Sequence, residues 1–218
     1  MKAIILAGGF GTRLKHILPN TPKPMADING EPFLQVLIHY LEAQGFDEFV
    51  LSIHHMREII EEHFEGRSNI KFAPEDEPLG TGGAIRNSIL HTGLEGDVAV
   101  INGDTFLELD YHKLFEAHKG RLTIALRKVE DTSRYGRVEV DGKRVSSFRE
   151  KGISGKGLIN AGSYVINSEW FMEQDLPEKF SFETDFMMKM FPEYFVTEGY
   201  FIDIGIPEDY KRAQNELA

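Results

Sequence analysis

The sequence has no cysteine, a single tryptophan and no long apolar run. Without cysteine, disulfide bonds, thiolate nucleophiles and zinc–thiolate sites are excluded. The apolar runs fall short of the roughly 20 residues needed to span a bilayer. The N-terminal apolar run ends in glycines instead of a small-residue cleavage site, which argues against a signal peptide. Together these absences predict a cytoplasmic protein.

Positive charge is also scarce: 24 Lys and Arg residues stand against 35 Asp and Glu residues, which gives a net charge of −11. Electrostatic repulsion argues against nucleic acid or an anionic membrane as a partner. Any site for an anionic ligand must therefore be built locally. With 218 residues and 41% hydrophobic content, the chain can bury one good core, which predicts a single domain over residues 1–218.

A glycine-rich loop follows the first apolar run. Residues 3–7 are typical of a buried strand, residues 8–12 contain three glycines, and Arg13 and a proline-flanked Lys23 come next. Glycines let backbone N–H groups approach an anion closely, and the two cations can neutralise a polyphosphate. The flanking prolines predict an extended, non-helical Lys23. The loop therefore predicts a nucleoside triphosphate ligand, with a turn whose glycines serve geometry alone as the alternative.

Two commoner phosphate-binding patterns are absent. The dinucleotide pattern that starts at Gly9 would need glycine where Leu14 stands. The P-loop pattern needs Gly-Lys-Ser or Gly-Lys-Thr, and neither tripeptide occurs in the chain. The loop is therefore a third kind of phosphate-binding candidate.

Strand-like and helix-like segments alternate in the first half of the chain, which implies parallel βαβ units and an α/β sandwich. The second half is richer in strands, and Asp141-Gly142 is a strong hairpin signal. The expected strands are residues 3–7, 49–53, 70–72, 98–101, 121–129, 138–140, 144–148, 158–166 and 200–202, and the expected helices are residues 32–44, 58–64, 83–90 and 207–215.

Residues 3–25 resemble the entry motif of the sugar-nucleotide pyrophosphorylases, nucleotidyltransferases that join a nucleoside triphosphate to a sugar 1-phosphate. The resemblance extends along the whole chain and is greatest to bacterial D-glycero-D-manno-heptose 1-phosphate guanylyltransferases. It implies a single-domain, Rossmann-like three-layer sandwich with a mixed, mainly parallel central sheet. It also implies that residues 1–110, approximately, bind the nucleotide and residues 111–218, approximately, bind the sugar.

The implied reaction is attack by a sugar-phosphate oxygen on the α-phosphorus, with pyrophosphate leaving in line. The protein mainly positions the reactants and neutralises charge. The resemblance assigns Arg13 to the β- and γ-phosphates, where charge grows in the transition state, and Lys23 to the α-phosphate. A structural alternative is that Arg13 only caps the loop through a carboxylate. The nucleotide is expected to contact Leu6, Ala7, Gly8, Gly9, Gly11, Thr12, Glu75, Gly80 and Thr81.

Two aspartates follow predicted strands. Asp104 comes shortly after the strand 98–101, and Asp203 directly follows the strand 200–202. Open α/β sheets bind ligands at the carboxyl ends of their strands. Two hard oxygen donors together with the triphosphate could complete an octahedral Mg²⁺ site. An aspartate in such a place is also a common turn former, but both positions match the family's metal-binding acids.

Glu75 bears on the choice of base. The segment 75–83 resembles the family's base-reading loop, in which enzymes that use uridine or thymidine triphosphate have a glutamine at this position. A carboxylate only accepts hydrogen bonds, which suits the N1–H and N2–H₂ donors of guanine and repels a uracil carbonyl. Glu75 therefore predicts GTP. Alternatively, Glu75 belongs to an exposed acidic run with Asp76 and Glu77.

The sugar side is predicted from three later segments. The resemblance implies that Glu150 accepts from sugar hydroxyls and that Lys151 holds the sugar phosphate. The remaining sugar-binding positions are Asn102, Gly136 and Asn160. Lys151 is followed by Gly152, where many members have proline. This departure leaves the sugar's identity open.

Three other functions are weighed against guanylyl transfer. Uridylyl transfer, or another nucleotidyl transfer, to a hexose or amino-sugar 1-phosphate is the nearest alternative. A metal-dependent glycosyltransferase would be expected to show Asp-x-Asp where this chain has Asn102-Gly103-Asp104. A nucleotide-sensing domain would be expected to lack Arg13, Lys23 or a metal-binding acid. The methionines at 187, 188 and 190 lie on an expected amphipathic helix and would pack in the core or at an interface, which is compatible with a homo-oligomer.

Overall fold

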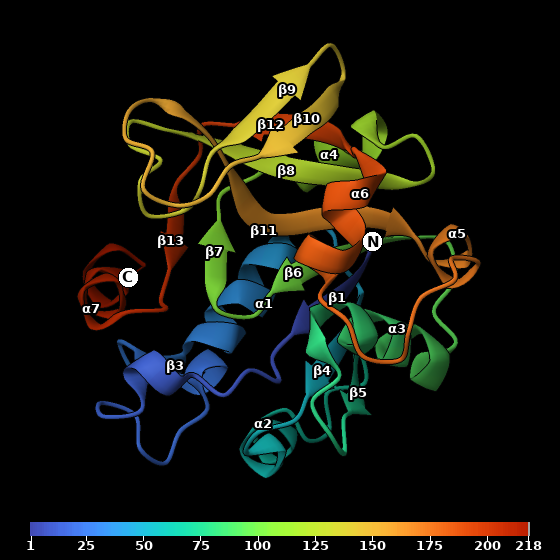
Figure 1. Ribbon diagram of the computed structural model, residues 1–218. Coiled ribbons are helices and arrows are strands. Elements are labelled where there is room, and N and C mark those ends of the chain that lie inside the picture. Colours follow the sequence, from blue (N-terminus) through green and yellow to red (C-terminus); the bar gives the residue numbers. More distant parts are fainter. Residues whose placement is uncertain (218) are drawn as a thin grey trace.

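A nine-stranded mixed sheet forms the centre of the computed structural model, which describes residues 1–217 (Figure 1). The strand order across the sheet is β5-β4-β1-β6-β11-β8-β12-β10-β9. The strands are β1 (Lys2–Leu6), β4 (Glu48–Ile53), β5 (Ile70–Pro74), β6 (Asp97–Asn102), β8 (Leu122–Val129), β9 (Val138–Asp141), β10 (Arg144–Phe148), β11 (Gly157–Asn167) and β12 (Glu193–Thr197).

The N-terminal half of the sheet is parallel, as the alternation of elements predicts. Strand β1 lies between β4 and β6, and Ile4 pairs with Val50 on one side and Val100 on the other. All three side chains are fully buried, as expected for parallel strands covered on both faces. The carboxyl ends of β1, β4 and β6 therefore meet at one edge, where the glycine-rich loop begins.

The C-terminal half corrects the expected sheet. Strand β11 is antiparallel to both β6 and β8, and β10 is antiparallel to both β9 and β12. Only β12, which the sequence did not predict, is parallel to its neighbour β8 there. The sheet is mixed, and the prediction that it is mainly parallel is not confirmed. In this half β9 and β10 are joined directly by a tight hairpin, a connection that only antiparallel strands can have.

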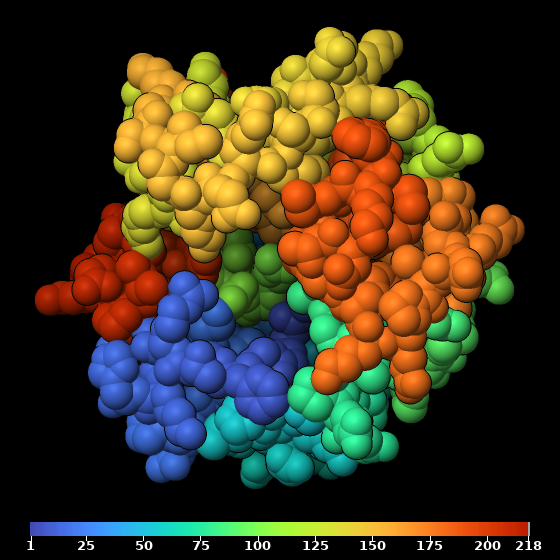
Figure 2. Space-filling model, viewed as in Figure 1, coloured from blue at the N-terminus to red at the C-terminus, as the bar shows by residue number. Residues whose placement is uncertain are grey.

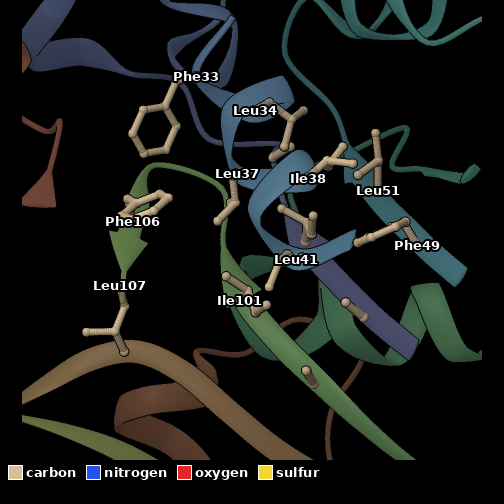
Figure 3. Close-up of a cluster of buried hydrophobic side chains, with 14 of the residues drawn as sticks. Phe33, Leu34, Leu37, Ile38, Leu41, Phe49, Leu51, Ile101, Phe106 and Leu107 are labelled. Carbon is tan, nitrogen blue, oxygen red and sulfur yellow. The ribbon is translucent and has the colours of Figure 1, made fainter. Parts of the chain in front are cut away.

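Two hydrophobic clusters lie on opposite faces of the sheet, because successive strand residues point to opposite sides. Ile5 of β1 belongs to one cluster and Ile4 to the other. Helix α1 (Phe33–Ala43) packs its apolar stripe on the first cluster, where Leu37 and Leu41 lie near Ile101 (Figure 3). Truncating such a buried leucine to alanine typically costs about 2–5 kcal/mol.

The other helices cover the two faces and the ends of the sheet. The face of Ile5 is covered by α2 (Arg57–His63), α4 (Tyr111–Ala117) and α7 (Pro207–Glu216). The face of Ile4 is covered by α3 (Gly80–Thr92), α5 (Ser168–Met172) and the π-helix η3 (Phe182–Met187), which α6 (Met188–Met190) continues. The expected helix around Met187 thus begins as a π-helix, at whose end Met187 is buried, while Met188, the first residue of α6, is exposed. Within residues 1–217, every helix is too short or too polar to cross a membrane.

Small elements complete the fold near the glycine-rich loop. They are the one-turn 3₁₀ helices η1 (Thr12–Leu14) and η2 (Lys23–Met25), the short strand pair β2 (Asp27–Ile28) and β3 (Glu31–Pro32), and the antiparallel pair β7 (Thr105–Leu107) and β13 (Phe201–Asp203). The expected strand at 200–202 therefore exists as β13. It pairs with β7 in a separate two-stranded sheet instead of joining the central one.

Candidate active site

An open cleft of about 850 Å³ lies at the carboxyl ends of β1, β4 and β6. Figure 2 shows the hollow in the middle of the viewed face, bordered by the blue N-terminal segment, the yellow segment of β9 and β10 and the orange segment of η3. The lining residues are Leu6, Gly8, Gly9, Phe10, Ser52, His54, Glu75, Pro78, Gly80, Thr81, Ala84, Asn102 and Asp104. Eight of the predicted site residues therefore share one cleft.

Close backbone contacts explain why glycine is needed at the cleft floor. The N–H of Gly103 donates to the carbonyl of Leu6 (3.0 Å), and a Cβ on Gly103 would lie 2.7 Å from that oxygen. Gly11 has φ +57°, and its Cβ would lie 3.1 Å from the Cβ of Lys23. These contacts bring Asp104 and Lys23 against the loop that follows β1.

Lys23 forms an ion pair with the carboxylate of Asp104 across the cleft floor. Its side chain is only 12% exposed, so the charge is held in place. Lys23 starts the 3₁₀ turn η2, with Pro22 in extended conformation before it. The expectation of a non-helical Lys23 was therefore wrong, because Pro24 fits the first turn of a helix, where its missing N–H costs nothing. Lys23 and Gly11 line a second, much smaller pocket that shares Phe10 with the cleft.

The pairing of β7 with β13 brings the two predicted metal-binding acids together. Asp203 pairs with Thr105, and the N–H of Ile204 donates to the carbonyl of Asp104 (3.0 Å). Burial and the neighbouring negative charge of Asp104 raise the pKa of Asp203. The N–H of Gly205 donates to Asp203 Oδ1 (2.7 Å) and opposes that rise in pKa, as do the charges of Lys23 and Arg13.

This acid pair suits a divalent cation. Two carboxylates that repel one another in a half-buried site gain stability when a dication neutralises both. Among residues 1–217, no group of three or more His, Cys, Asp or Glu side chains is arranged to hold a metal. A cation at Asp104 and Asp203 would thus take its remaining ligands from phosphate oxygens and water, as Mg²⁺ commonly does.

Arg13 extends from η1 toward the acid pair. Its Nη2 lies 3.4 Å from the position that a Cβ on Gly205 would occupy, and its charge lowers the pKa of Asp203. Within the described part of the chain, the guanidinium of Arg13 makes no ion pair with a carboxylate. The alternative in which Arg13 caps the loop through a carboxylate is therefore not found.

Glu75 lies in the wall of the cleft, directly after β5, and is only 7% exposed. The hydroxyl of Ser52 donates to its Oε1 (2.9 Å), and the N–H of Leu79 donates to its Oε2 (3.0 Å). Asp76 and Glu77, in contrast, are exposed. The interpretation of Glu75 as part of an exposed acidic run is therefore wrong, since its carboxylate faces inward while its neighbours face solvent.

The predicted sugar-binding residues form two groups. Asn160 donates through Nδ2 to the hydroxyl of Tyr164 (2.8 Å) and accepts at Oδ1 from the N–H of Gly162 (3.0 Å). A Cβ on Gly162 would lie 2.7 Å from Nδ2 of Asn102, so Asn160 is linked to the cleft floor. This arrangement depends on a β-bulge in β11, which shifts its register against β8 between residues 160 and 164.

The second group lies above the cleft. Gly136 has φ +78°, and its Cβ would lie 2.8 Å from the carbonyl of Arg149, so its loop packs on the segment that carries Glu150 and Lys151. Glu150 and Lys151 are exposed and are absent from the described lining of the cleft. Thr132, fully buried, donates to the carbonyl of Ile153 (2.6 Å) and ties the two loops together.

Comparison with known proteins settles the family. Residues 2–218 match the Nucleotidyl transferase family. The chain belongs to the nucleotidyl transferase family. This nucleotidyl transferase is 45% identical, over 100% of its length and 98% of the relative, to a D-glycero-alpha-D-manno-heptose 1-phosphate guanylyltransferase of Aneurinibacillus thermoaerophilus. A Campylobacter jejuni protein of the same description is 43% identical, over 96% of this chain and 97% of its own.

Solved structures agree with this nucleotidyl transferase in fold. The crystal structure of HddC from Yersinia pseudotuberculosis superimposes with a TM-score of 0.90 at 43% identity, covering 100% of this chain and 99% of that one. HddC complexed with GMP-PN gives a TM-score of 0.89 at the same identity and coverage. The resemblance predicted from the sequence, to sugar-nucleotide transferases and to heptose 1-phosphate guanylyltransferases among them, is confirmed.

Several residues of the nucleotidyl transferase cleft were not predicted from the sequence. Phe10, Ser52, His54, Pro78 and Ala84 line it together with the predicted positions. Ser52 and His54 flank the end of β4, so the same strand-end rule that pointed to Asp104 could have found them. Of the predicted nucleotide contacts, Ala7 is buried under the loop and Thr12 begins η1, and neither belongs to the cleft lining.

Proposed function

We propose that this nucleotidyl transferase transfers the guanylyl group of GTP to D-glycero-D-manno-heptose 1-phosphate, giving a GDP-sugar and pyrophosphate. The observation that carries the proposal is the buried, acceptor-only carboxylate of Glu75 in the cleft wall, in a chain 43–45% identical over nearly its full length to heptose 1-phosphate guanylyltransferases. Guanine presents two adjacent donors, N1–H and N2–H₂, which such a carboxylate matches.

The triphosphate would lie over the glycine-rich loop, between the cations and the acid pair. Lys23 reaches the cleft floor from η2 and would hold the α-phosphate, and Arg13 would neutralise the departing β- and γ-phosphates. Preorganised cations lower the barrier because charge moves onto the leaving pyrophosphate in the transition state. The loop glycines 8, 9 and 11 would leave room for phosphate oxygens close to the backbone.

Asp104 and Asp203 would hold the divalent cation, which we propose to be Mg²⁺. The fit rests on two hard oxygen donors that lie close together, and burial and the nearby charge of Asp104 raise the pKa of Asp203. When bound, Mg²⁺ supplies charge neutralisation at the phosphates. The protein keeps both carboxylates in place through two hydrogen bonds: the N–H of Ile204 donates to the carbonyl of Asp104, and the N–H of Gly205 donates to the carboxylate of Asp203.

The sugar 1-phosphate would enter from the side of β11. Asn102 and Asn160, linked through Gly162, would bind ring hydroxyls, and Gly136 would shape the opposite wall. Glu150 would accept from sugar hydroxyls and Lys151 would hold the sugar phosphate, although both are exposed and neither belongs to the described cleft lining. We accordingly propose one catalytic domain, with residues 1–110, approximately, binding nucleotide and the following residues binding sugar. The continuous nine-stranded sheet supports this.

A pyrophosphate-release screen tests the proposal. The purified protein is assayed with ATP, CTP, GTP, UTP and dTTP against both anomers of the heptose 1-phosphate and against mannose, glucose and N-acetylglucosamine 1-phosphates, with Mg²⁺ and with EDTA. We expect turnover to be greatest with GTP and a heptose 1-phosphate and to be lost in EDTA. Preferential use of UTP or dTTP would overturn the base assignment, and preference for a hexose would overturn the sugar assignment.

A further inference from the structure

We infer that Ser52 is a positioning residue for guanine selection: its hydroxyl orients the Glu75 carboxylate so that the two acceptor sites left free face the base. This deepens the proposed function and rests on it. The inference follows from a count of hydrogen-bonding capacity. An ionised carboxylate offers about four acceptor sites. One on Oε1 is taken by Ser52 and one on Oε2 by the N–H of Leu79.

One acceptor site therefore remains on each oxygen. Guanine presents two donors side by side, N1–H and N2–H₂, so the remaining capacity matches it one to one. Hypoxanthine lacks the 2-amino group and fills only one of the two sites. Adenine presents an acceptor at N1, and uracil presents carbonyl oxygens, and both would meet a carboxylate with repulsion. A carboxylate acceptor that loses its water and gains no donor from the base costs binding energy, which is how such a site discriminates between bases.

The orientation of the carboxylate depends on Ser52 because the serine is buried and paired on both sides in the sheet. Ser52 is 1% exposed in β4, in register with Leu6 of β1 on one side and Ala73 of β5 on the other. Its carbonyl accepts from the N–H of Ala7 (2.8 Å), which leads directly into the glycine-rich loop. The hydroxyl is thus carried by one of the last residues of an inner strand, which is paired on both sides at the edge of the cleft.

The backbone of Glu75 is held as firmly. Its N–H donates to the carbonyl of Ile53 (2.9 Å), and its carbonyl lies 2.9 Å from Nδ1 of His54. A Cβ on Gly8 would approach Oε1 to 3.3 Å, so the loop also limits where the carboxylate can go. With backbone and Oε2 held, the bond from Ser52 to Oε1 sets the rotation of the carboxylate plane.

The test compares GTP with ITP, the nucleotide that lacks only the 2-amino group. Kinetics are measured for the wild type, Ser52→Ala and Ser52→Thr, with Mg²⁺ and a saturating sugar 1-phosphate. In Ser52→Ala we expect the ratio of kcat/KM for GTP to that for ITP to fall about tenfold, the scale of one hydrogen bond to a charged group. The change is expected in KM, with kcat nearly unchanged, because the base is remote from the reacting phosphorus.

Ser52→Thr keeps the hydroxyl and suits a strand, so we expect it to restore the ratio. Ser88→Ala is the matched control: Ser88 is fully buried, and its hydroxyl bonds to the carbonyl of Ala84 inside α3 (2.8 Å), away from Glu75. Its ratio is expected to equal that of the wild type. The ratio compares two substrates of one preparation, so it does not depend on the fraction of protein that folds.

The variant Glu75→Gln distinguishes a failure of the role of Ser52 from a failure of the proposed base assignment. If Glu75→Gln reduces the ratio while Ser52→Ala leaves it unchanged, the role of Ser52 is overturned and the proposed base reading stands. If neither variant changes the ratio, guanine is read elsewhere and both are overturned. If Ser52→Ala and Ser52→Thr reduce it equally, packing is responsible instead of the hydroxyl, which also overturns the inference.

Discussion

Lys23 and Asp104 form an ion pair although they stand 81 positions apart in the sequence. Asp203 is the second carboxylate at this point, and burial and the nearby charge of Asp104 raise its pKa. Without a metal, the ammonium group of Lys23 therefore balances only one of the two carboxylates. A divalent cation at the acid pair would take over that neutralisation and leave Lys23 available for the α-phosphate. The pair would therefore connect the proposed metal binding with the proposed nucleotide binding at one point of the cleft.

Removing the ammonium group tests this connection. We expect Lys23→Ala to reduce the rate of pyrophosphate release about 10²- to 10³-fold, the typical loss of one preorganised charge donor. Circular dichroism should show an intact fold, and the metal concentration for half-maximal rate should fall, because Lys23 no longer competes for Asp104. Lys15→Ala removes an exposed lysine nearby and serves as the control. A rate equal to that of the wild type would refute the role of Lys23.

The raised pKa of Asp203 predicts a pH dependence of stability in metal-free protein. The folded state binds this proton more tightly than the unfolded chain does, so the contribution of Asp203 to the free energy of unfolding decreases as pH rises above about 4. Asp203→Asn should flatten that decrease. Urea titrations in EDTA between pH 4 and 7 measure it, and equal slopes for the two proteins would contradict the assignment. Asp203→Asn should also lose the metal-dependent rate.

Gly162 offers a test of the link between the two asparagines. Its φ is +70°, and an added Cβ would meet Nδ2 of Asn102 at 2.7 Å. We expect Gly162→Ala to raise KM for the sugar 1-phosphate more than KM for GTP and to destabilise the fold by about 1–3 kcal/mol. Gly142→Ala is the control, since its φ is +57° with open space around it. Its cost should be limited to about 1 kcal/mol of backbone strain. Equal kinetics in both variants would contradict the link.

An ion pair on the buried carboxylate of Asp209 fastens the C-terminal helix to the loop before β9. Both Nη atoms of Arg134 contact the carboxylate of Asp209, whose side chain is only 4% exposed, and Arg212 contacts it as well (3.2 Å). Because Arg212 remains, we expect Arg134→Gln to lower the free energy of unfolding by about 1–3 kcal/mol. Lys156→Gln removes a solvent-exposed pair with Glu130 and should cost about 0–1 kcal/mol. Denaturant midpoints compare them, and equal losses would contradict the distinction.

Local sequence patterns predicted the elements that have a strong period or clear ends. Helix α1 was expected at 32–44 and runs over Phe33–Ala43, because its apolar stripe and its flanking proline and glycine act locally. Helix α3 was expected from residue 83 but begins at Gly80. The glycines of its first turn are poor helix formers but are needed for packing, because a Cβ on Gly82 would overlap the ring of Phe180. This contact joins distant segments and leaves no local signal in the sequence.

Long-range pairing explains what the sequence could not reveal. Strand β12 was missed because none of its five residues is fully buried and its burial shows no clear alternation, so its pairing with the distant strands β8 and β10 defines it. The strand end of Asp203 was predicted, but not its partner β7, since register between distant strands leaves no local signal. Glu75 was singled out by chemistry, whereas the hydroxyl of Ser52 that holds it became visible only in the folded chain.

The β7–β13 pairing also divides the two proposed tasks of the cleft between distant parts of the chain. Glu75 and Ser52, proposed to read the base, both precede the end of β6, whereas Asp203 reaches the cleft only through β13. Displacing β13 from β7 would therefore remove one of the two acids proposed to hold the metal and leave the residues proposed to read the base in place.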